Sequence, residues 1–127
     1  MTSEPLKVLV VDDEPPLREL VVVTLGDEYS CDEAPDGDAA LKRMRRVPYD
    51  LVMLDVMMPG RSGLDVLREM RLDESLRDIS VVVMSAWQSS EDVDAVLEAG
   101  ADGFLAKPFR VEELGSTVKS VLERRPK

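Results

Sequence analysis

Four short apolar segments of this chain each end in side chains that can bind or receive a phosphoryl group. These side chains are Asp12 and Asp13 after residues 8–11, Asp55 after residues 51–54, Ser85 after residues 81–84, and Lys107 after residues 103–106. If the segments are parallel strands of an open α/β sheet, their carboxyl ends meet at one edge, where such sheets bind ligands. The sequence therefore predicts that three carboxylates, a hydroxyl and an ammonium converge on one site.

The chemistry of this set is that of a hard cation and a phosphoryl group. Clustered carboxylates repel one another, and a divalent cation such as Mg²⁺, which prefers carboxylate, water and phosphate oxygens, relieves the conflict. Asp13 and Asp55 are candidates for direct metal contact, with Asp12 acting through water. A carboxylate can also attack phosphorus to form an aspartyl phosphate. The metal and Lys107 would then offset the phosphoryl charge, and Ser85 would donate a hydrogen bond.

Each of these residues alone has a simpler explanation. Asp12 and Asp13 could form a turn or cap a helix, and Asp55 could be a turn residue. Ser85 could cap a local turn, and Lys107 could be a solvated surface lysine. Their occurrence together, at matching positions on different strands, favours the functional interpretation.

The composition is that of one globular domain. The chain has 127 residues, 44% hydrophobic and 33% charged, and this length suits a single core. Its 26 acidic and 16 basic side chains give a net charge of −10, which argues against direct nucleic-acid binding because that usually leaves a basic footprint. Histidine is absent, which excludes Ser-His-Asp and Cys-His mechanisms. Any phosphohistidine must therefore belong to a partner.

No segment predicts secretion or membrane insertion. The first apolar run, residues 8–11, stops at Asp12 and is too short for a signal peptide. No stretch approaches the roughly 18 apolar residues of a membrane helix. Cys31 is the only cysteine, so no internal disulfide can form, and we expect a packed thiol in a cytoplasmic protein.

Apolar segments alternate five times with amphipathic segments. Apolar residues at helical spacing predict five helices, over residues 17–25, 40–44, 64–70, 93–97 and 111–122. Pro15 and Pro16 suit a first helical turn, and Ser62 is a candidate N-cap. This alternation indicates an α/β fold with parallel strands and right-handed crossovers.

The polarity of the strands predicts their order in the sheet. The first, third and fourth strands are nearly continuous apolar runs, which is typical of strands buried on both faces. The second, residues 29–34, is far more polar, and the fifth is short and contains Gly103. Both suit sheet edges, and the strand order 2-1-3-4-5 places them there. In that order the crevice lies between strands 1 and 3, where Asp12, Asp13 and Asp55 end.

This arrangement resembles the receiver domain of bacterial two-component response regulators, with the chemotaxis regulator as its single-domain type. The resemblance covers residues 7–122 of one domain, residues 1–127. It rests on the ordered set Val-Val-Asp-Asp-Glu at 10–14, Ala-Pro-Asp-Gly at 34–37, the segment 50–60, Ser85-Ala86, and the segment 100–109. It implies a five-stranded parallel sheet with five helices, a flavodoxin-like (βα)5 three-layer sandwich.

The resemblance also assigns the acceptor site. Asp55 is the implied phosphoacceptor. Asp12, Asp13 and Asp55, with the backbone carbonyl of Met57, are the implied ligands of Mg²⁺, with Mn²⁺ as an alternative. Lys107 is expected to pair with the phosphoryl group, and the bond between Lys107 and Pro108 is expected to be cis, as in the family.

The implied function is a phosphorylation-activated switch rather than an enzyme. Asp55 would take the phosphoryl group from the phosphohistidine of a sensor kinase or phosphotransfer protein, as in a phosphorelay. The new charge would draw the Ser85 hydroxyl inward, and Phe104, at the switch aromatic position, would rotate into the space. The face of the fourth helix, fifth strand and fifth helix would then change shape. The alternative for Phe104 is a ring that stays in the core.

Met57 and Trp87 occupy positions that, in the family, tune attack of water on the phosphoryl group. Neither side chain readily orients water as a carboxylate or amide could, so we expect slow self-dephosphorylation. Both could instead merely cover neighbouring apolar surface. Trp87 is the only tryptophan, so its fluorescence is expected to respond to Mg²⁺ or a phosphoryl mimic.

The chain reaches Lys127 just past the fifth predicted helix and begins with Met1. We expect either a stand-alone receiver acting on a protein target or the N-terminal part of a longer regulator with a fused output domain. It would be a monomer or a phosphorylation-dependent dimer. Residues 90–98, on the fourth helix, contain no basic residue, which puts the charge-paired dimer of winged-helix regulators in doubt. This acidic stretch could meet a basic partner or simply be solvated.

Three rival functions fit less well. A dehalogenase-like phosphatase needs a second aspartate two residues after its nucleophile, where this chain has Met57. A nucleotide-binding domain needs a glycine-rich motif after the first strand, and neither Gly-x-x-x-x-Gly-Lys-Ser/Thr nor Gly-x-Gly-x-x-Gly is present there. A receiver-like scaffold that no longer accepts phosphate would not need the complete set of acceptor residues.

Overall fold

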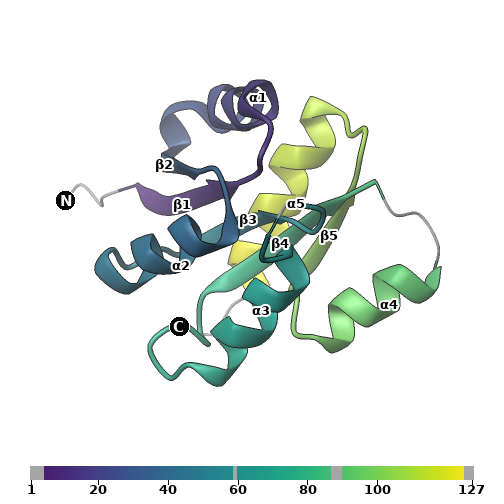
Figure 1. Ribbon diagram of the computed structural model, residues 1–127. Helices are drawn as coiled ribbons and strands as arrows, with labels where there is room; N and C mark the ends of the chain where they lie inside the picture. The colour runs from purple at the N-terminus through teal and green to yellow at the C-terminus, as the bar shows by residue number, and fades with distance from the viewer. Residues whose placement is uncertain (1–4, 59, 87–89, 125–127) are drawn as a thin grey trace.

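The computed structural model describes residues 5–58, 60–86 and 90–124. In these residues five strands alternate with five α-helices (Figure 1). The strands are β1 (Leu6–Val11), β2 (Tyr29–Ala34), β3 (Leu51–Asp55), β4 (Ser80–Ser85) and β5 (Gly103–Ala106). The helices are α1 (Pro15–Leu25), α2 (Gly37–Arg46), α3 (Gly63–Leu72), α4 (Ser90–Glu98) and α5 (Val111–Arg124). Among the described helices, none has the combined length and apolarity needed to cross a bilayer.

All five strands are parallel, and their order β2-β1-β3-β4-β5 confirms the order predicted from strand polarity. The last four residues of β1 and every residue of β3 and β4 are buried, whereas β2 and β5 form the edges. β1 begins at Leu6, two residues before the apolar run, because Leu6 and Lys7 pair with Tyr29 and Ser30 of β2. Pairing with a neighbouring strand therefore extends β1 beyond its apolar segment.

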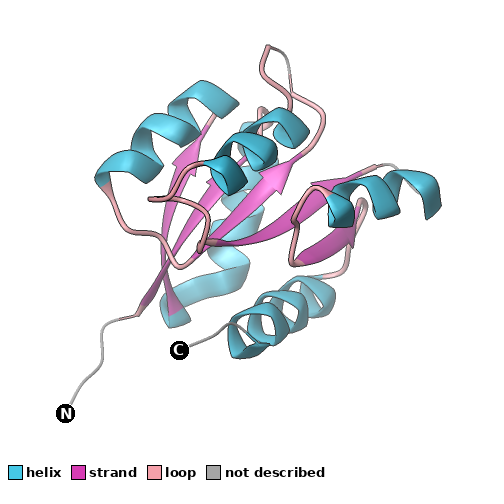
Figure 2. Ribbon diagram, turned by 90° about the horizontal axis from the view of Figure 1, so that it is seen from below, coloured by secondary structure: helices cyan, strands magenta, loops and turns pink. Residues whose placement is uncertain are grey.

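Helices cover both faces of the sheet, which makes a three-layer sandwich (Figures 1 and 2). On one face, Val21 of α1 and Val118 of α5 pack with Val10 and Met53 of the sheet. On the other, the apolar sides of α2, α3 and α4 pack on alternate residues of the same strands. Successive strand residues point to opposite faces, so the continuous apolar runs supply both cores at once.

Local signals in the sequence fix several helix starts. α1 begins at Pro15, in the first turn where proline costs no hydrogen bond. Ser62 caps α3, because its Oγ accepts a hydrogen bond from the Asp65 amide at 3.2 Å, as predicted. Asp36 caps α2 in the same way, through a 2.8 Å bond from the Ala39 amide. These caps satisfy helix amides that would otherwise lack partners.

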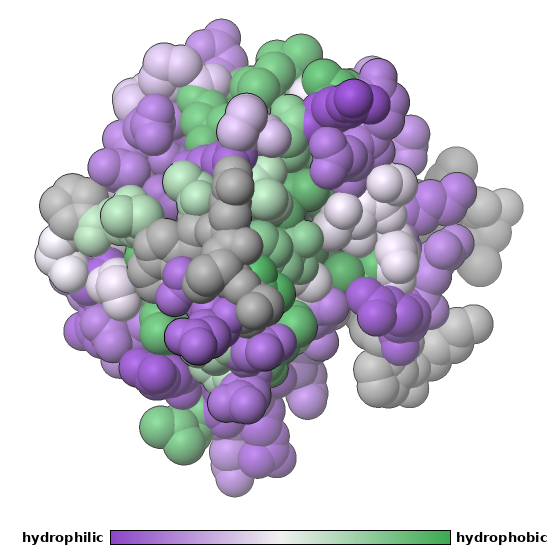
Figure 3. All heavy atoms as spheres, turned by 90° about the vertical axis from the view of Figure 1, so that its right-hand side faces the viewer, coloured by the Kyte–Doolittle hydropathy of each residue, from purple (hydrophilic) through white to green (hydrophobic). Residues whose placement is uncertain are grey.

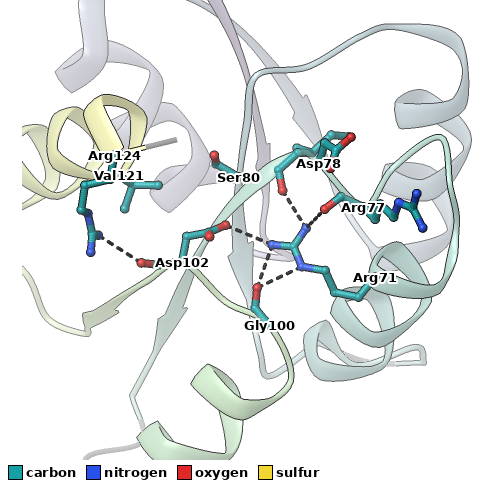
Figure 4. Close-up of a pocket in the computed structure, with 9 residues that line it drawn as sticks. Arg71, Arg77, Asp78, Ser80, Gly100, Asp102, Val121 and Arg124 are labelled. Atoms are coloured by element: carbon teal, nitrogen blue, oxygen red, sulfur yellow. Dashed lines mark hydrogen bonds and ion pairs between the residues drawn. The ribbon is translucent and has the colours of Figure 1, made fainter. Parts of the chain in front are cut away.

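The end of the sheet where β4 and β5 begin is held together by Arg71 at the end of α3 (Figure 4). Its guanidinium makes five hydrogen bonds of 2.7–3.0 Å to the carbonyls of Gly100, Arg77 and Ile79 and to the Asp102 carboxylate. Asp102 also accepts a 2.8 Å bond from the Val81 amide. One side chain thus ties α3 to the turns that enter β4 and β5.

Candidate functional site

The predicted acidic cluster forms at the carboxyl ends of β1 and β3. Carboxylate oxygens of Asp12, Asp13 and Asp55 all lie within 4.8 Å of one another. Val11 pairs with Leu54 in the sheet, so Asp12 follows β1 at the level where Asp55 closes β3. Asp12 and Asp55 are buried and Asp13 is exposed. The adjacent strand ends bring together carboxylates that are 43 positions apart in the sequence.

Asp12 is bonded on both of its carboxylate oxygens. The Lys107 ammonium lies 2.9 Å from Oδ2, and the Glu14 amide donates to Oδ1 at 2.9 Å. The Arg18 guanidinium reaches back from α1 to donate to the Asp12 backbone carbonyl and also pairs with Glu33. Asp12 is therefore held in place by contacts from three directions.

Asp55 carries a carboxylate in an unfavourable electrostatic setting. Burial, and then the charge of Asp12, raise its pKa from 3.8 to about 6, although Lys107 and the Met57 amide act in the opposite direction. The Lys107 ammonium lies 3.4 Å from Asp55 Oδ1, and the Met57 amide donates to the same oxygen at 3.2 Å. More positive charge near Asp55 would favour its ionised form.

Lys107 is the cation shared by the two buried carboxylates. Burial works to lower its pKa, but the hydrogen bond and charges of Asp12 and Asp55 outweigh burial and raise the pKa above its usual value. Lys107 follows β5, and its amide donates to the Ser85 carbonyl at 2.8 Å. The bond between Lys107 and Pro108 is cis.

Ser85 and Phe104 lie on the two strands next to the cluster. Ser85 closes β4, is fully buried, and follows Met84, the sheet partner of Asp55. Phe104 on β5 pairs with Val83 and packs, partly exposed, against the core that α2, α3 and α4 cover. Ser85 and Phe104 thus lie on adjacent strands, two positions apart in the register of the sheet.

Met57 lies at the surface beside the cluster. Its backbone amide is bonded to Asp55, yet 56% of the residue is exposed. Met58, the next residue, is only 8% exposed. Met57 and Met58 line a surface pocket of about 430 Å³ together with Val56, Ser62 and Leu64. Trp87, the other residue predicted to tune the phosphoryl lifetime, lies outside the described residues.

Two residues that the sequence did not predict as part of the site also support it. Arg18 anchors the backbone of Asp12, as described above. Gly63 begins α3 directly against β3, where an added Cβ would overlap the backbone carbonyl of Asp55. Ser62, the predicted cap, marks the start of this helix. Nothing in the sequence, however, indicates how closely Gly63 approaches the backbone of Asp55.

The donor set of the cluster consists of oxygen atoms from three carboxylates. Such a set suits a hard cation and lacks the nitrogen and sulfur ligands that favour zinc. The three carboxylates outnumber the one ammonium, that of Lys107, which contacts the cluster in the described residues, so an additional cation would balance the charge. With Ser85 and Lys107 beside it, the arrangement can hold a cation and bind an anionic group next to Asp55.

Comparisons with known proteins identify the family. The model of the response regulator receiver domain matches residues 8–119. The chain is 38% identical over 119 residues to the phosphate regulon transcriptional regulatory protein PhoB of Escherichia coli, covering 93% of this chain and 52% of PhoB. It is 39% identical to the DNA-binding response regulator MtrA of Mycolicibacterium smegmatis, covering 93% of this chain and 51% of MtrA. The chain thus spans about half the length of these curated relatives.

Solved structures agree with these relatives. The chemotaxis response regulator CheY4 of Vibrio cholerae superposes with a TM-score of 0.88 at 31% identity, over 93% of this chain and 99% of that one. The BeF3-activated DrrB receiver domain gives a TM-score of 0.85 at 30% identity, over 95% of this chain and 100% of that one. The chain belongs to the response regulator receiver domain family, the phosphorylation-driven signalling domains of two-component systems.

Proposed function

We propose that Asp55 is the phosphoacceptor and that this chain takes its phosphoryl group from the phosphohistidine of a sensor histidine kinase or phosphotransfer protein. The observation that carries the proposal is the position of Lys107, whose ammonium lies 2.9 Å from Asp12 and 3.4 Å from Asp55. An ammonium this close to Asp55 could offset the negative charge of phosphoryl oxygens bound to that carboxylate. Both carboxylate oxygens of Asp12 are engaged, by Lys107 and the Glu14 amide, whereas the contacts described for Asp55 all go to Oδ1, so Asp12 is less free to react.

Asp12, Asp13 and Asp55, with the backbone carbonyl of Met57, would hold Mg²⁺, and Mn²⁺ could take its place. The all-oxygen cluster and the raised pKa of Asp55 support this assignment. When bound, the metal would supply positive charge that ionises Asp55 and offsets the charge of the phosphoryl oxygens. Mg²⁺ usually keeps several waters and takes only one or two carboxylates directly, which fits a cluster with one exposed member, Asp13.

In the transfer step, an Asp55 carboxylate oxygen attacks phosphorus as the bond from phosphorus to the partner's histidine nitrogen breaks. The histidine leaves with the electron pair of that bond, and an aspartyl phosphate forms on Asp55. Lys107 pairs with a phosphoryl oxygen, and the Ser85 hydroxyl donates to another. Hydrolysis reverses the modification when water attacks phosphorus and inorganic phosphate leaves.

Signalling would begin with Ser85. The phosphoryl group adds a charge near −2 beside a buried hydroxyl, and movement of Ser85 toward it would open space for Phe104. Phe104 is on β5 and only partly buried, so its ring has an inward position to gain. Because phenylalanine has no hydroxyl, packing alone would decide between its two positions.

The surface formed by α4, β5 and α5 is the proposed signalling face. It exposes Leu97 of α4 at 45% and Val111 of α5 at 53%. Seen from the side on which α4 lies in Figure 1, apolar residues extend from the centre of the view to its upper edge, with hydrophilic residues on either side (Figure 3). A downstream protein or a fused output domain would bind this face, through which a phosphorylated dimer could also form.

Receiver domains are phosphoacceptors rather than classical enzymes. Here the expected reactions are self-phosphorylation from a small donor and slow self-dephosphorylation in the cytoplasm. The apolar Met57 supports slow hydrolysis, because a thioether does not readily orient water. The paired substitution Met57→Asn plus Trp87→Glu should shorten the lifetime of the phosphorylated state, and an unchanged lifetime would refute this role.

The test of the proposed function is an intact-mass measurement after incubation with Mg²⁺ and a small phosphodonor. The chain should gain one phosphoryl group, lose it slowly, and gain none when Mg²⁺ is chelated. Asp55→Asn should abolish the gain. Rapid turnover of the donor without accumulation of a phosphorylated chain, or an undiminished gain in Asp55→Asn, would contradict the proposal.

A further inference from the structure

Met57 differs from every other methionine in the part of the chain that the structure describes. It is 56% exposed, whereas Met44, Met53, Met58, Met70 and Met84 are each 8% exposed or less. A thioether is oxidised when its sulfur meets the oxidant, so exposure selects the site. The seventh methionine, Met1, lies outside the described residues.

Cys31 does not compete effectively for the same oxidants. Burial, and then the charges of Asp32 and Glu33, raise the pKa of its thiol to about 11. Peroxides react with the thiolate rather than the thiol, and little thiolate exists at neutral pH with such a pKa. Met57 is therefore the exposed sulfur most open to peroxides in the described part of the molecule, because the partly buried thiol of Cys31 forms little thiolate.

The location of this sulfur gives its oxidation a consequence. Met57 is two residues from Asp55, and its amide donates to the Asp55 carboxylate at 3.2 Å. Its neighbours in the surface pocket include the apolar residues Val56, Met58 and Leu64. As a thioether, Met57 adds apolar surface close to the Asp55 carboxylate.

We propose that Met57 is a site of reversible oxidation by peroxides, through which oxidants shorten the lifetime of the phosphorylated state. The effect on lifetime rests on the proposed function of Asp55. The sulfur lone pair attacks one peroxide oxygen, the O–O bond breaks and an S–O bond forms. Hydrogen peroxide is thereby reduced to water and the thioether is oxidised to a sulfoxide. A dithiol-dependent sulfoxide reductase returns the oxygen as water and leaves a disulfide in the reductant.

The sulfoxide changes both polarity and hydrogen bonding at this position. Its oxygen is a strong acceptor, unlike the thioether sulfur. A water molecule bound to it lies beside the acyl phosphate and is positioned to attack phosphorus, which releases inorganic phosphate and restores the Asp55 carboxylate. We expect hydrolysis to become about fivefold faster, which corresponds to about 1 kcal/mol of activation free energy.

The first measurement locates the oxidation. The folded chain is treated with hydrogen peroxide, digested, and mapped by mass spectrometry. One added oxygen should appear at Met57 well before any at Met58, its buried neighbour and internal control. Equal oxidation of Met57 and Met58, or none at Met57, would overturn the proposed modification site.

The second measurement follows decay of the acyl phosphate in peroxide-treated and untreated chains, each phosphorylated with Mg²⁺ and a small phosphodonor. Treatment should accelerate decay in the wild type and in Met58→Leu, but not in Met57→Leu, with each variant compared to its own untreated form. Sulfoxide reductase should restore the slow rate. Equal decay before and after treatment of the wild type would overturn the effect on lifetime. Failure of untreated chains to form an acyl phosphate would instead contradict the role of Asp55, while the oxidation map would still decide the modification site.

Discussion

The two ends of the parallel sheet handle charge in opposite ways. Where β4 and β5 begin, the five hydrogen bonds of Arg71 match the five N–H donors of a guanidinium. Where β1 and β3 end, three carboxylates cluster, Lys107 contacts only two of them, and the pKa of Asp55 is raised to about 6. At the first end every N–H donor of the Arg71 guanidinium has an acceptor within the chain. At the second end the carboxylates have too little positive charge around them.

This difference indicates that the end held by Arg71 contributes to stability, whereas the end with the acidic cluster is suited to binding. Buried or half-buried polar groups stabilise a fold when they are all paired, as they are around Arg71. A cluster that is short of positive charge costs stability and leaves a binding site for a cation or a phosphoryl group. Charge removal at the two ends should therefore have opposite effects on the free energy of unfolding.

The largest effect is expected at the end held by Arg71. Arg71→Ala removes five hydrogen bonds and leaves the carbonyls of Gly100 and Ile79 without these partners, so unfolding free energy should fall by about 3 kcal/mol. Urea denaturation measures this change. Arg68→Ala, at an exposed arginine on the same helix, is the matched control and should stay within about 0.5 kcal/mol of the wild type. Equal losses in the two variants would contradict the importance of the Arg71 contacts.

Mg²⁺ should act at the other end alone. At a concentration 100-fold above its dissociation constant, a ligand that binds only the folded state stabilises it by about 2.7 kcal/mol. This gain should be retained in Arg71→Ala, because none of the hydrogen-bond partners of Arg71 belongs to the acidic cluster. It should be largely lost in Asp13→Asn. Thermal or urea unfolding with and without Mg²⁺ tests both statements. A gain that disappears in Arg71→Ala would show that the two ends are coupled.

A smaller effect of opposite sign is expected for Asp55→Asn without Mg²⁺. The folded pKa of about 6 exceeds the ordinary 3.8, so the folded state binds the proton more tightly than the unfolded state does. The wild type therefore loses stability as pH rises from about 4 to about 6. Allowing for water screening near the exposed Asp13, Asp55→Asn should be about 1–2 kcal/mol more stable than the wild type at pH 7.

The pH dependence of that difference provides its control. At pH 4 the Asp55 carboxyl is largely protonated in the folded state, so the variant and the wild type should have nearly equal unfolding free energies in a chelating buffer. The difference should then grow with pH and level off above about 6. A difference that is the same at pH 4 and pH 7 would argue for a packing effect rather than charge.

The contrast between the two ends also separates what the sequence could predict from what it could not. Strand polarity and the residues that end each strand can be read directly from the amino-acid sequence. Together they predicted the sheet order and the clustering of Asp12, Asp13 and Asp55. Parallel strands make this possible, because the strand ends themselves determine which residues become neighbours. The prediction needed no side-chain conformation.

Arg71 could not be predicted in this way. Its main partners are backbone carbonyls in two turns, and every residue has a carbonyl, so the sequence contains no signal for the pairing. Arg18 and Gly63 were missed for the same reason, since each contacts the backbone of an acidic residue. Asp12 and Asp55 could be identified from their types, but the contacts that hold them depend on how the helices pack.

The most direct test of the account is to locate the phosphoryl group chemically. The chain is phosphorylated with Mg²⁺ and a small phosphodonor, and borohydride then reduces the acyl phosphate so that the acceptor aspartate becomes homoserine. Peptide mass spectrometry should find homoserine at position 55 and unmodified aspartate at positions 12 and 13. Homoserine at either of those two positions, or at none of the three in a chain that gained a phosphoryl group, would contradict the assignment of Asp55.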